Sequence, residues 1–471
     1  MTLAPRLSHA WPFLLATLAS VVLFYPSWAR LVEIWLKWEQ TMSHGLPTAI
    51  AYLALLVIHP PLGSSSGWSD RGLWSRPVGG ILLILVTFAW AALELVRIDT
   101  LAYLSLPVSL FAITWTLLGL GGALKLVPYL LLLSLSLPIW ADLIPILVDM
   151  ATIVVGSAVS ALGITALIEG SNITLAYGRL VIADGCSGIG FLAIAMLLGA
   201  FTAILNDYRW RGWAMIMSCS IVLALVINWV RIIALVLIAD WTNMESSLVR
   251  EHELFGWIVF AAFILPALVL APVRRRKTLQ TGNDHVISHS GFGFILTALV
   301  AGTGVVFLVQ AREIEESPLS ITSSDFSEIS AQALPLPLQV PDQLEQKFYV
   351  EEDTGVYVSL AQIQRHSPEQ KIVPYLPPLV DRDMWFREAT PAPGKEIWRR
   401  INTTQRVVVS HIYAIGGYRT DSYVKAKLLQ LPAIYSGRTR FALISLQTLC
   451  ETSTCDEGLD RLAAFEAATD I

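Results

Sequence analysis

The stretch WAMIMSCSIVLALVINWVRIIALVLI, from Trp213 to Ile238, decides the fold class of this chain. Its only charged residue is Arg231. A helix of about 20 apolar residues crosses the ~30 Å hydrocarbon core of a bilayer. The stretch therefore predicts a transmembrane helix.

The rest of the chain repeats this pattern. Of its 471 residues, 55% are hydrophobic and only 15% are charged, which is typical of a multi-pass membrane protein. Several of the 16 Trp residues lie at the ends of apolar runs, as in an interfacial aromatic belt. We predict a mainly α, polytopic protein with about eight core transmembrane helices and a ninth that leads to a soluble domain. The predicted spans are Trp11–Ala29, Leu46–His59, Gly79–Val96, Leu101–Leu118, Ala123–Leu137, Gly188–Asn206, Trp213–Ile238, Leu254–Pro272 and Gly291–Gln310.

Lys and Arg in the short loops predict the orientation, because they collect on the cytoplasmic side. With the N-terminus inside, alternate loops carry the basic residues, and the strongest cluster is Arg274–Lys277. This arrangement divides the chain into a membrane core (1–273), a cytoplasmic basic loop (274–290), an additional transmembrane helix (291–310) and an external domain (311–471).

The segment 141–167 decides whether this orientation holds. Asp149, Thr152, Gly156, Ser160 and Gly163 recur at steps of three and four and form one polar or small stripe on a helix. We predict an interfacial or re-entrant helix on the outer face. A true span is the alternative, and it would place Cys186 inside. The alternating segment Ile173–Ala183 then predicts a short hairpin that leads to Cys186.

The composition changes after the ninth span. From Ala311 onward the chain has many charges, Pro-rich stretches and alternating runs such as Arg406–Tyr413. The tail has the size of one domain and predicts a soluble α+β fold. Cys450 and Cys455 lie close together in this outward-facing part, which favours a local disulfide, with free thiols as the alternative.

Cys186 is the first candidate for chemistry. It lies in Asp184-Gly185-Cys186-Ser187-Gly188, where the sixth predicted membrane helix begins. A helix N-terminus or a nearby cation lowers the pKa of a thiol and makes the nucleophilic thiolate more abundant. Free N–H groups of the first turn are suited to an oxyanion. The alternative for a lone cysteine is a small packing residue in a turn.

Arg231 and His252 belong to the same predicted membrane surface. Arg231 lies about 18 residues into its span, which at ~1.5 Å per residue places it near the outer boundary. A buried arginine suggests an electrostatic role towards a carbonyl oxygen or the thiol, and Asn228 shares its helical face. A snorkelling arginine at lipid headgroups is the alternative. His252 precedes the eighth span and suits a general acid and base, although a single interfacial histidine can also be structural.

Three stretches together resemble the signature motifs of exosortases. They are Cys186-Ser187-Gly188-Ile189, Asn228-Trp229-Val230-Arg231-Ile232 and His252-Glu253-Leu254-Phe255-Gly256-Trp257. Ser43-His44-Gly45 resembles the N-terminal signature of that family, with a loop histidine of structural role as the alternative for His44. The resemblance extends over about residues 1–272.

The resemblance implies a cysteine protease or transpeptidase of the bacterial inner membrane. Cys186, Arg231 and His252 are the implied catalytic residues, with Asn228, His44, Ser187 and Gly188 in support. The implied substrates are exported proteins with a C-terminal sorting signal of the PEP-CTERM type: a short motif, a membrane helix and a basic tail. Such systems are linked to exopolysaccharide production, so exopolysaccharide or its assembly machinery is a further implied partner.

The tail carries a second resemblance. Val407–Lys427, with Gly416-Gly417 and Arg419-Thr420, looks like part of the exosortase-associated C-terminal domain, although the usual upstream Cys-Pro stretch is absent. The resemblance therefore implies an enzyme core fused to this domain in the periplasm.

Other function classes find little support. The sequence has no Gly-rich phosphate loop, metal-ligand spacing or basic and aromatic nucleic-acid surface, so we expect no cofactor, metal or nucleic acid. The alternative function is a non-catalytic membrane component of polysaccharide export with a periplasmic binding domain. That alternative predicts a dispensable Cys186.

Overall fold

The computed structural model describes most of the chain in two compact units. The described residues are 4–37, 44–61, 75–140, 143–169, 172–182, 184–250, 252–271, 289–320, 326–367, 370–381, 384–401, 403–452 and 454–468. One unit, the membrane unit, comprises residues 1–90 and 99–303. The other, the C-terminal unit, comprises residues 91–98 and 304–471. The predicted basic cluster 274–277 lies outside the described residues.

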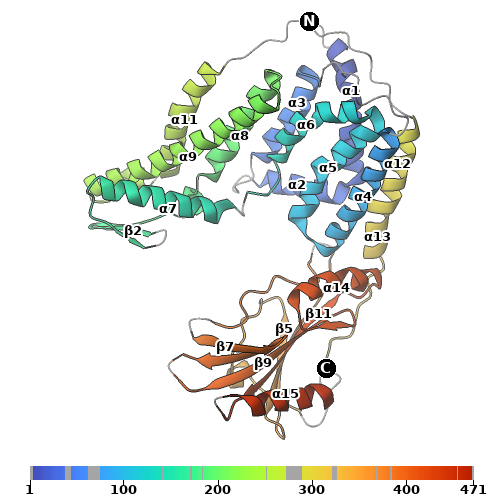
Figure 1. Cartoon of the computed structure of the whole chain (residues 1–471), viewed down its shortest axis with the longest axis vertical. Helices are drawn as coiled ribbons and strands as arrows, with labels where there is room; N and C mark the ends of the chain where they lie inside the picture. Colours follow the sequence, from blue (N-terminus) through green and yellow to red (C-terminus); the bar gives the residue numbers. More distant parts are fainter. Residues whose placement is uncertain are drawn as a thin grey trace. The chain divides into compact units, whose positions relative to one another are not determined.

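The membrane unit is built mainly from apolar helices (Figure 1). They are α1 (Ala4–Leu23), α2 (Tyr25–Leu36), α3 (Gly45–Ile58), α4 (Ser75–Val96), α5 (Asp99–Leu118), α6 (Leu120–Ser134), α7 (Ile144–Ala161), α8 (Ile189–Leu205), α9 (Trp210–Trp241), α10 (Ser247–Arg250), α11 (His252–Leu270) and α12 (His289–Leu299). A π-helical turn, η3 (Val300–Gly304), and α13 (Val305–Gln310) continue α12, while the last residues of α4 and all of α13 belong to the C-terminal unit.

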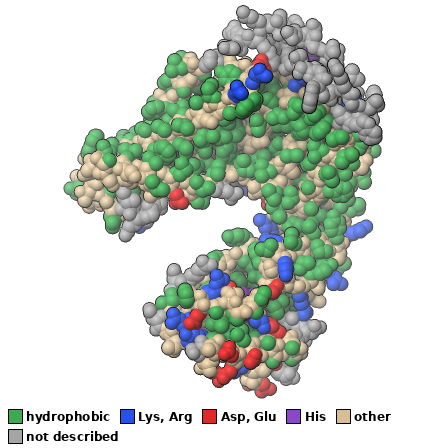
Figure 2. All heavy atoms as spheres, in the orientation of Figure 1, with side chains coloured by type: hydrophobic (Ala, Val, Ile, Leu, Met, Phe, Trp, Pro, Cys, Tyr) green, Lys and Arg blue, Asp and Glu red, His purple; other side chains and the backbone are tan. Residues whose placement is uncertain are grey.

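Six of the described helices are long and apolar enough to cross a membrane. They are Arg76–Val96, Asp99–Leu118, Ile144–Ala161, Trp210–Trp241, His252–Leu270 and Gly291–Gln310. The count becomes seven if the bent pair α1 and α2 forms one span. Helices α3, α6 and α8 are shorter. Figure 2 shows hydrophobic side chains over much of the visible face of the helices. The mainly helical class is confirmed, and the count of nine spans stays a prediction.

The first predicted span differs from the structure. The predicted span Trp11–Ala29 extends over parts of two helices, and the chain bends by 97° between α1 and α2. Pro26 lies in the first turn of α2. Proline has no N–H group, and its ring clashes with the carbonyl group four residues earlier. Pro26 therefore favours the bend at this position.

A small sheet connects α7 to α8. Its three antiparallel strands are β1 (Leu167–Glu169), β2 (Asn172–Leu175) and β3 (Gly178–Val181). The pairing of Leu175 with Gly178 confirms the predicted hairpin. Figure 1 shows this sheet and α7 near the same end of α9. They share a buried apolar cluster that includes Val155, Ile173 and Val236, and Cys186 packs against it.

Helix α7 has one buried stripe and one exposed stripe. Leu147, Ala151, Val155 and Val159 are buried, and so is Gly156 of the predicted polar or small stripe, while Asp149 and Ser160 are exposed together with Ile146 and Ile153. The helix therefore directs an apolar face towards α9 and the sheet. Its length and composition also suit a span. Its location, at the membrane surface or across it, stays a prediction.

The C-terminal unit contains an antiparallel sheet. Its strands are β4 (Phe326–Glu328), β5 (Glu345–Glu351), β6 (Val356–Gln364), β7 (Trp385–Ala392), β8 (Lys395–Arg400), β9 (Arg406–Ile415), β10 (Tyr418–Thr420) and β11 (Arg440–Leu449). The order is β4-β5-β6-β11-β9-β8-β7, and β10 pairs with β9. In the central register, Leu443 pairs with Ala361 of β6 and Tyr413 of β9.

Each face of this sheet has its own apolar cluster. Leu462 and Phe465 of α15 (Asp456–Ala468) pack on the face that carries Leu360 and Ala442. Leu336 and Trp398 belong to the cluster on the other face. Helix α14 (Tyr423–Tyr435) contacts β9 and β10. The predicted C-terminal domain with strands and helices is confirmed. Cys450 and Cys455 form a disulfide with their Cα atoms 4.9 Å apart.

Candidate active site

Cys186 lies in a tight turn before α8. It is the last residue of a short 3₁₀ helix, Asp184–Cys186, and its thiol is free and partly buried. Gly188 then begins α8 with a φ of +79°, a conformation that favours glycine. Ser187 is buried, and its Oγ accepts a hydrogen bond from the Ile189 N–H at 3.4 Å. The turn thus fixes the backbone on both sides of the thiol.

Asn228 of α9 holds this turn in place. Its Nδ2 donates a hydrogen bond to the carbonyl oxygen of Cys186 at 3.0 Å. A Cβ atom on Gly188 would lie 2.5 Å from Asn228 Cγ, so only glycine permits this approach. Asn228 is buried, and its Oδ1 has no hydrogen-bond partner among the described residues. The amide therefore retains one unused acceptor beside the candidate nucleophile.

Arg231 of α9 is bonded to the start of α11, where the candidate His252 lies. Its Nη2 donates a hydrogen bond to the carbonyl oxygen of His252, the first residue of α11, at 3.1 Å. The arginine is only 3% exposed, and Cζ lies 5.4 Å from the centre of the Phe191 ring. Such a cation–π contact stabilises a guanidinium that has lost its water. Within the described part of the chain, Nε has no hydrogen-bond partner.

Gly256 makes the position of Arg231 possible. A Cβ atom on Gly256 would lie 2.4 Å from Arg231 Nε and 2.8 Å from Cζ. On the Phe191 side, the ring stacks on Phe260 at 4.8 Å and meets Trp257 edge-on at 5.3 Å. The guanidinium therefore lies between the α11 backbone at Gly256 and the ring of Phe191.

The charge of Arg231 reaches the candidate nucleophile. The guanidinium interacts electrostatically with Cys186 and, more weakly, with the exposed Glu253. Glu251 lies outside the described residues.

The glycines around Cys186 are of two kinds. Gly188 and Gly256 are in tight contact with Asn228 and Arg231, whereas a Cβ atom on Gly185 or Gly190 would meet nothing within 4 Å. The turn is thus fixed on its α9 side, whereas the Cβ positions of Gly185 and Gly190 have no close neighbour among the described residues.

The structure brings together most of the predicted residues. The turn that carries Cys186, Ser187 and Gly188 meets Asn228, while Arg231 meets the start of α11 at His252. His44 is placed by other contacts. Its Nε2 lies 3.1 Å from the carbonyl oxygen of Leu135, and its ring meets Trp140 edge-on at 6.3 Å. These contacts place His44 beside the end of α6, and its role at the site stays a prediction.

Two residues at the site were not among the predicted ones. Gly256 was quoted within a motif but given no role, although a glycine one turn after His252 in an apolar helix was a signal for close packing. Phe191 had no such signal, because one aromatic residue among many in an apolar helix does not stand out.

Comparison with known proteins identifies one family. No curated protein and no solved structure matches the chain. The sequence model of one family, described as "Transmembrane exosortase (Exosortase_EpsH)", matches residues 28–269, which is more than half of the chain and includes every residue of the site described above. The chain therefore belongs to the transmembrane exosortase family.

Proposed function

We propose that this protein is a membrane-embedded cysteine transpeptidase or protease with Cys186, Arg231 and His252 as its catalytic residues. Membership of the exosortase family supports a membrane transpeptidase role in protein sorting. The proposed substrates are exported proteins with a C-terminal sorting signal of the PEP-CTERM type. The proposed location is the bacterial inner membrane, with the site and the C-terminal domain in the periplasm.

One observation carries the catalytic assignment. Asn228 and Arg231 lie one helical turn apart on α9, and each donates a hydrogen bond to the main chain of a different candidate, Cys186 and His252. Residues three apart share one face of a helix. A single helix face therefore supports both the nucleophile and the acid–base residue.

The proposed reaction begins at the thiolate. Cys186 Sγ attacks the scissile carbonyl carbon and forms a C–S bond, and the electron pair of the C=O bond moves to oxygen. The oxyanion is stabilised by Arg231 and by the N–H groups at the start of α8. The His252 imidazolium gives its proton to the amine nitrogen as the C–N bond breaks. A thioester at Cys186 and a free amine result.

The second step regenerates the enzyme. Neutral His252 removes a proton from water, an amine or a hydroxyl group as that nucleophile attacks the thioester carbon. The C–S bond breaks, and the electron pair returns to sulfur as thiolate. Water gives hydrolysis, whereas an amine or hydroxyl acceptor gives transpeptidation.

The direct test is Cys186→Ala with a tagged substrate that carries the sorting signal. We expect processing to be abolished while the variant still inserts into the membrane. Cys219→Ala is a matched control, because Cys219 is also a free thiol of the membrane unit but is exposed on α9. Processing by Cys186→Ala at the rate of Cys219→Ala would overturn the proposal and favour the non-catalytic alternative.

The orientation has a separate test. A membrane-impermeant maleimide is added to intact cells that express the Cys219→Ala/Cys450→Ser/Cys455→Ser variant, in which Cys186 is the remaining thiol. We expect labelling from outside. Labelling of Cys186 only after permeabilisation would place the site on the cytoplasmic side.

A further inference from the structure

Helix α14 of the C-terminal unit is apolar on two opposite sides. One side is buried and includes Ala426, Ala433 and Ile434. The opposite side carries four apolar residues at steps of three and four, which therefore form one row along the helix. We call this row the α14 face, and it consists of Val424, Leu428, Pro432 and Tyr435.

The α14 face is exposed along its whole length. Val424, Leu428 and Tyr435 are 70%, 66% and 54% exposed, and Pro432 is exposed as well. Single exposed apolar side chains are common on proteins, but a contiguous row of large ones is typical of an interaction surface. The exposed Lys425 flanks the row. An apolar row with a long basic side chain beside it is typical of a helix that lies in the interface of a bilayer.

The C-terminal end of α14 lies next to the end of a candidate membrane span. The span Gly291–Gln310 ends with α13, which contacts α14. Two residues further on, the carbonyl oxygen of Arg312 lies 2.5 Å from the Cβ position of Gly437, and the Ile314 N–H donates to the Gly437 carbonyl oxygen at 2.8 Å. Two residues extend at most about 7 Å, which is about the thickness of one headgroup layer. With Gln310 at the edge of the hydrocarbon core, the end of α14 falls at the level of the headgroups.

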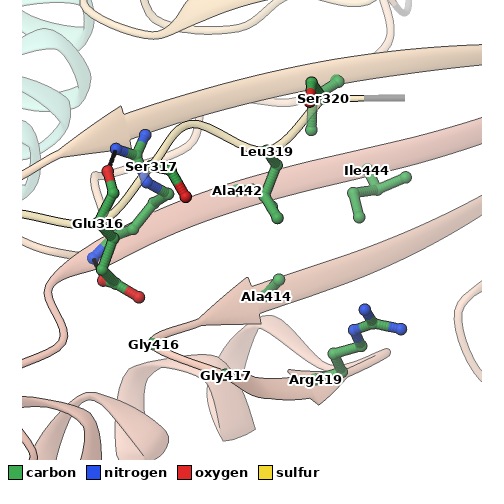
Figure 3. A pocket seen from close by; sticks show the side chains of 12 residues that line it. Glu316, Ser317, Leu319, Ser320, Ala414, Gly416, Gly417, Arg419, Ala442 and Ile444 are labelled. Carbon is green, nitrogen blue, oxygen red and sulfur yellow. Dashed lines mark hydrogen bonds between the residues drawn. The ribbon is translucent and has the colours of Figure 1, made fainter. Parts of the chain in front are cut away.

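The C-terminal unit is bonded to the ends of two candidate spans. After the span Gly291–Gln310, Arg440 of β11 donates from its backbone N–H to the Glu316 carboxylate at 2.8 Å and from its side chain to the Glu316 carbonyl oxygen (Figure 3). The second span is Arg76–Val96, whose last residues belong to the same unit. Nη1 of Arg365 donates to the carbonyl oxygen of Leu95 at 3.2 Å. The sheet is therefore attached directly where both spans end.

We infer that the α14 face inserts into the lipid at the surface of the membrane that holds these spans. Figure 1 shows α14 lying across the direction of α13, with the sheet on its other side. A helix in this position runs along the membrane surface, and its exposed face points away from the sheet. Tyr435 then lies in the interface, where tyrosine is enriched. The inference depends neither on the proposed reaction nor on the side of the membrane that the C-terminal unit occupies.

The test measures the depth of a probe in the bilayer. Full-length protein with Cys186→Ala, Cys219→Ala and Leu428→Cys is labelled with a nitrobenzoxadiazole fluorophore, while Cys450 and Cys455 remain in their disulfide. The protein is reconstituted in vesicles of phosphatidylethanolamine and phosphatidylglycerol that contain lipids with a nitroxide at a shallow or a deep position. We expect the two quenching values to place the probe roughly 5–10 Å into the boundary between headgroups and acyl chains.

Phe386→Cys is the matched control, because Phe386 is also a large exposed residue of the C-terminal unit but lies on β7. We expect lipid nitroxides to leave the probe at this position unquenched. Val424→Asp and Tyr435→Asp, added to the Leu428→Cys protein, should reduce the quenching to the level of the control, because carboxylates are unfavourable among acyl chains.

Three outcomes would overturn the inference. One is equal quenching at positions 428 and 386, and another is unchanged quenching in the variant with two aspartates. The third is a blue-shifted emission at position 428 that neither nitroxide lipid quenches. That result would show that protein covers the α14 face, either the membrane unit or a second copy of the chain.

Discussion

Three buried polar side chains, one in the C-terminal unit and two in the membrane unit, differ in how completely they are hydrogen-bonded. In the C-terminal unit, Gln447 is fully buried, and its amide bonds to both the N–H and the carbonyl group of Leu336, at 3.0 and 2.9 Å. In the membrane unit, buried Asn228 and Arg231 each use one donor on the main chain and leave another polar atom without a partner among the described residues.

This difference distinguishes a buried polar group that stabilises the fold from buried polar groups that remain partly unbonded at the candidate site. A buried group without a partner costs about 1–3 kcal/mol, so native proteins rarely retain one without a reason. Gln447 closes a local network and holds a chain segment. Asn228 retains an acceptor, Oδ1, and Arg231 retains a donor, Nε, that no described residue uses. Substitution of Asn228 or Arg231 should therefore affect processing, whereas substitution of Gln447 should affect stability.

Arg231→Lys should have the largest effect. Lysine keeps the charge but cannot bond to the His252 carbonyl oxygen and stack on Phe191 with one planar group. We expect processing to fall by about 10²–10³-fold, the effect of losing one oxyanion donor. The rate of cleavage of a tagged substrate in membranes measures this. The control is Arg211→Lys, an exposed arginine near the start of the same helix. Similar rates for the two variants would contradict a special role for Arg231.

Gln447→Met should act on stability alone. Methionine has a similar shape but leaves the Leu336 N–H and carbonyl groups buried without partners. We expect the C-terminal unit to lose roughly 3 kcal/mol of unfolding free energy. Pulse proteolysis in urea, scored for cleavage within residues 326–468, measures the loss. If Gln447→Met left the stability unchanged but slowed the processing of the tagged substrate, the comparison would be contradicted.

His411 predicts a pH dependence of the C-terminal unit. Burial lowers the pKa of His411 from 6.5 to about 4, and Nδ1 lies 2.9 Å from Ser445 Oγ. Between these pH values the unfolded chain binds a proton that the folded chain does not, so stability falls as the pH falls. At pH 5 the loss is about 2 kcal/mol relative to neutral pH.

The same proteolysis assay at pH 7 and pH 5 tests this expectation. His411→Asn should remove most of the pH dependence. His366→Asn, at an exposed histidine of the same unit, should leave it unchanged. Equal pH dependence in both variants would show that other groups cause it.

Gly256→Ala should have the smallest effect. The new methyl group would meet Arg231 Nε at 2.4 Å, so the guanidinium must move. We expect about tenfold slower processing, or about 1.4 kcal/mol. Gly293→Ala is the control, since nothing lies within 4 Å of its Cβ position. If Gly256 acts through Arg231, the double variant Gly256→Ala/Arg231→Lys should process the substrate no more slowly than Arg231→Lys alone, so the two effects on the rate are not additive.

Some contacts around Cys186 could be anticipated from the sequence, while the catalytic roles of these residues stay predictions. A lone arginine in an apolar run is costly, so Arg231 was conspicuous, and Asn228 one turn earlier shared its face. The hairpin before Cys186 followed from local alternation and a turn, which depend on neighbouring residues only. The mixed C-terminal domain followed from composition.

Features that depend on distant residues could not be predicted. The tight contact of Gly256 with Arg231 requires α9 and α11 to approach closely, and no local pattern specifies the partner of a glycine. The order of strands from β4 to β7 depends on pairings such as β6 with β11, which are far apart in the chain. Pro26 was a local signal for the bend at α2, but the surrounding apolar residues are equally typical of a continuous span.

The length of α9 has a consequence for the lipid around the protein. The helix extends about 48 Å over its 32 residues, and its apolar stretch Trp213–Ile238 extends about 39 Å, about 9 Å more than an average hydrocarbon core. A helix with such hydrophobic mismatch tilts steeply, thickens the adjacent bilayer or protrudes beyond it. Its last turns are anchored to the small sheet through Val236 and Ala239, so α9 cannot adjust its tilt alone. Bilayer thickness therefore acts on the geometry that Asn228 and Arg231 maintain.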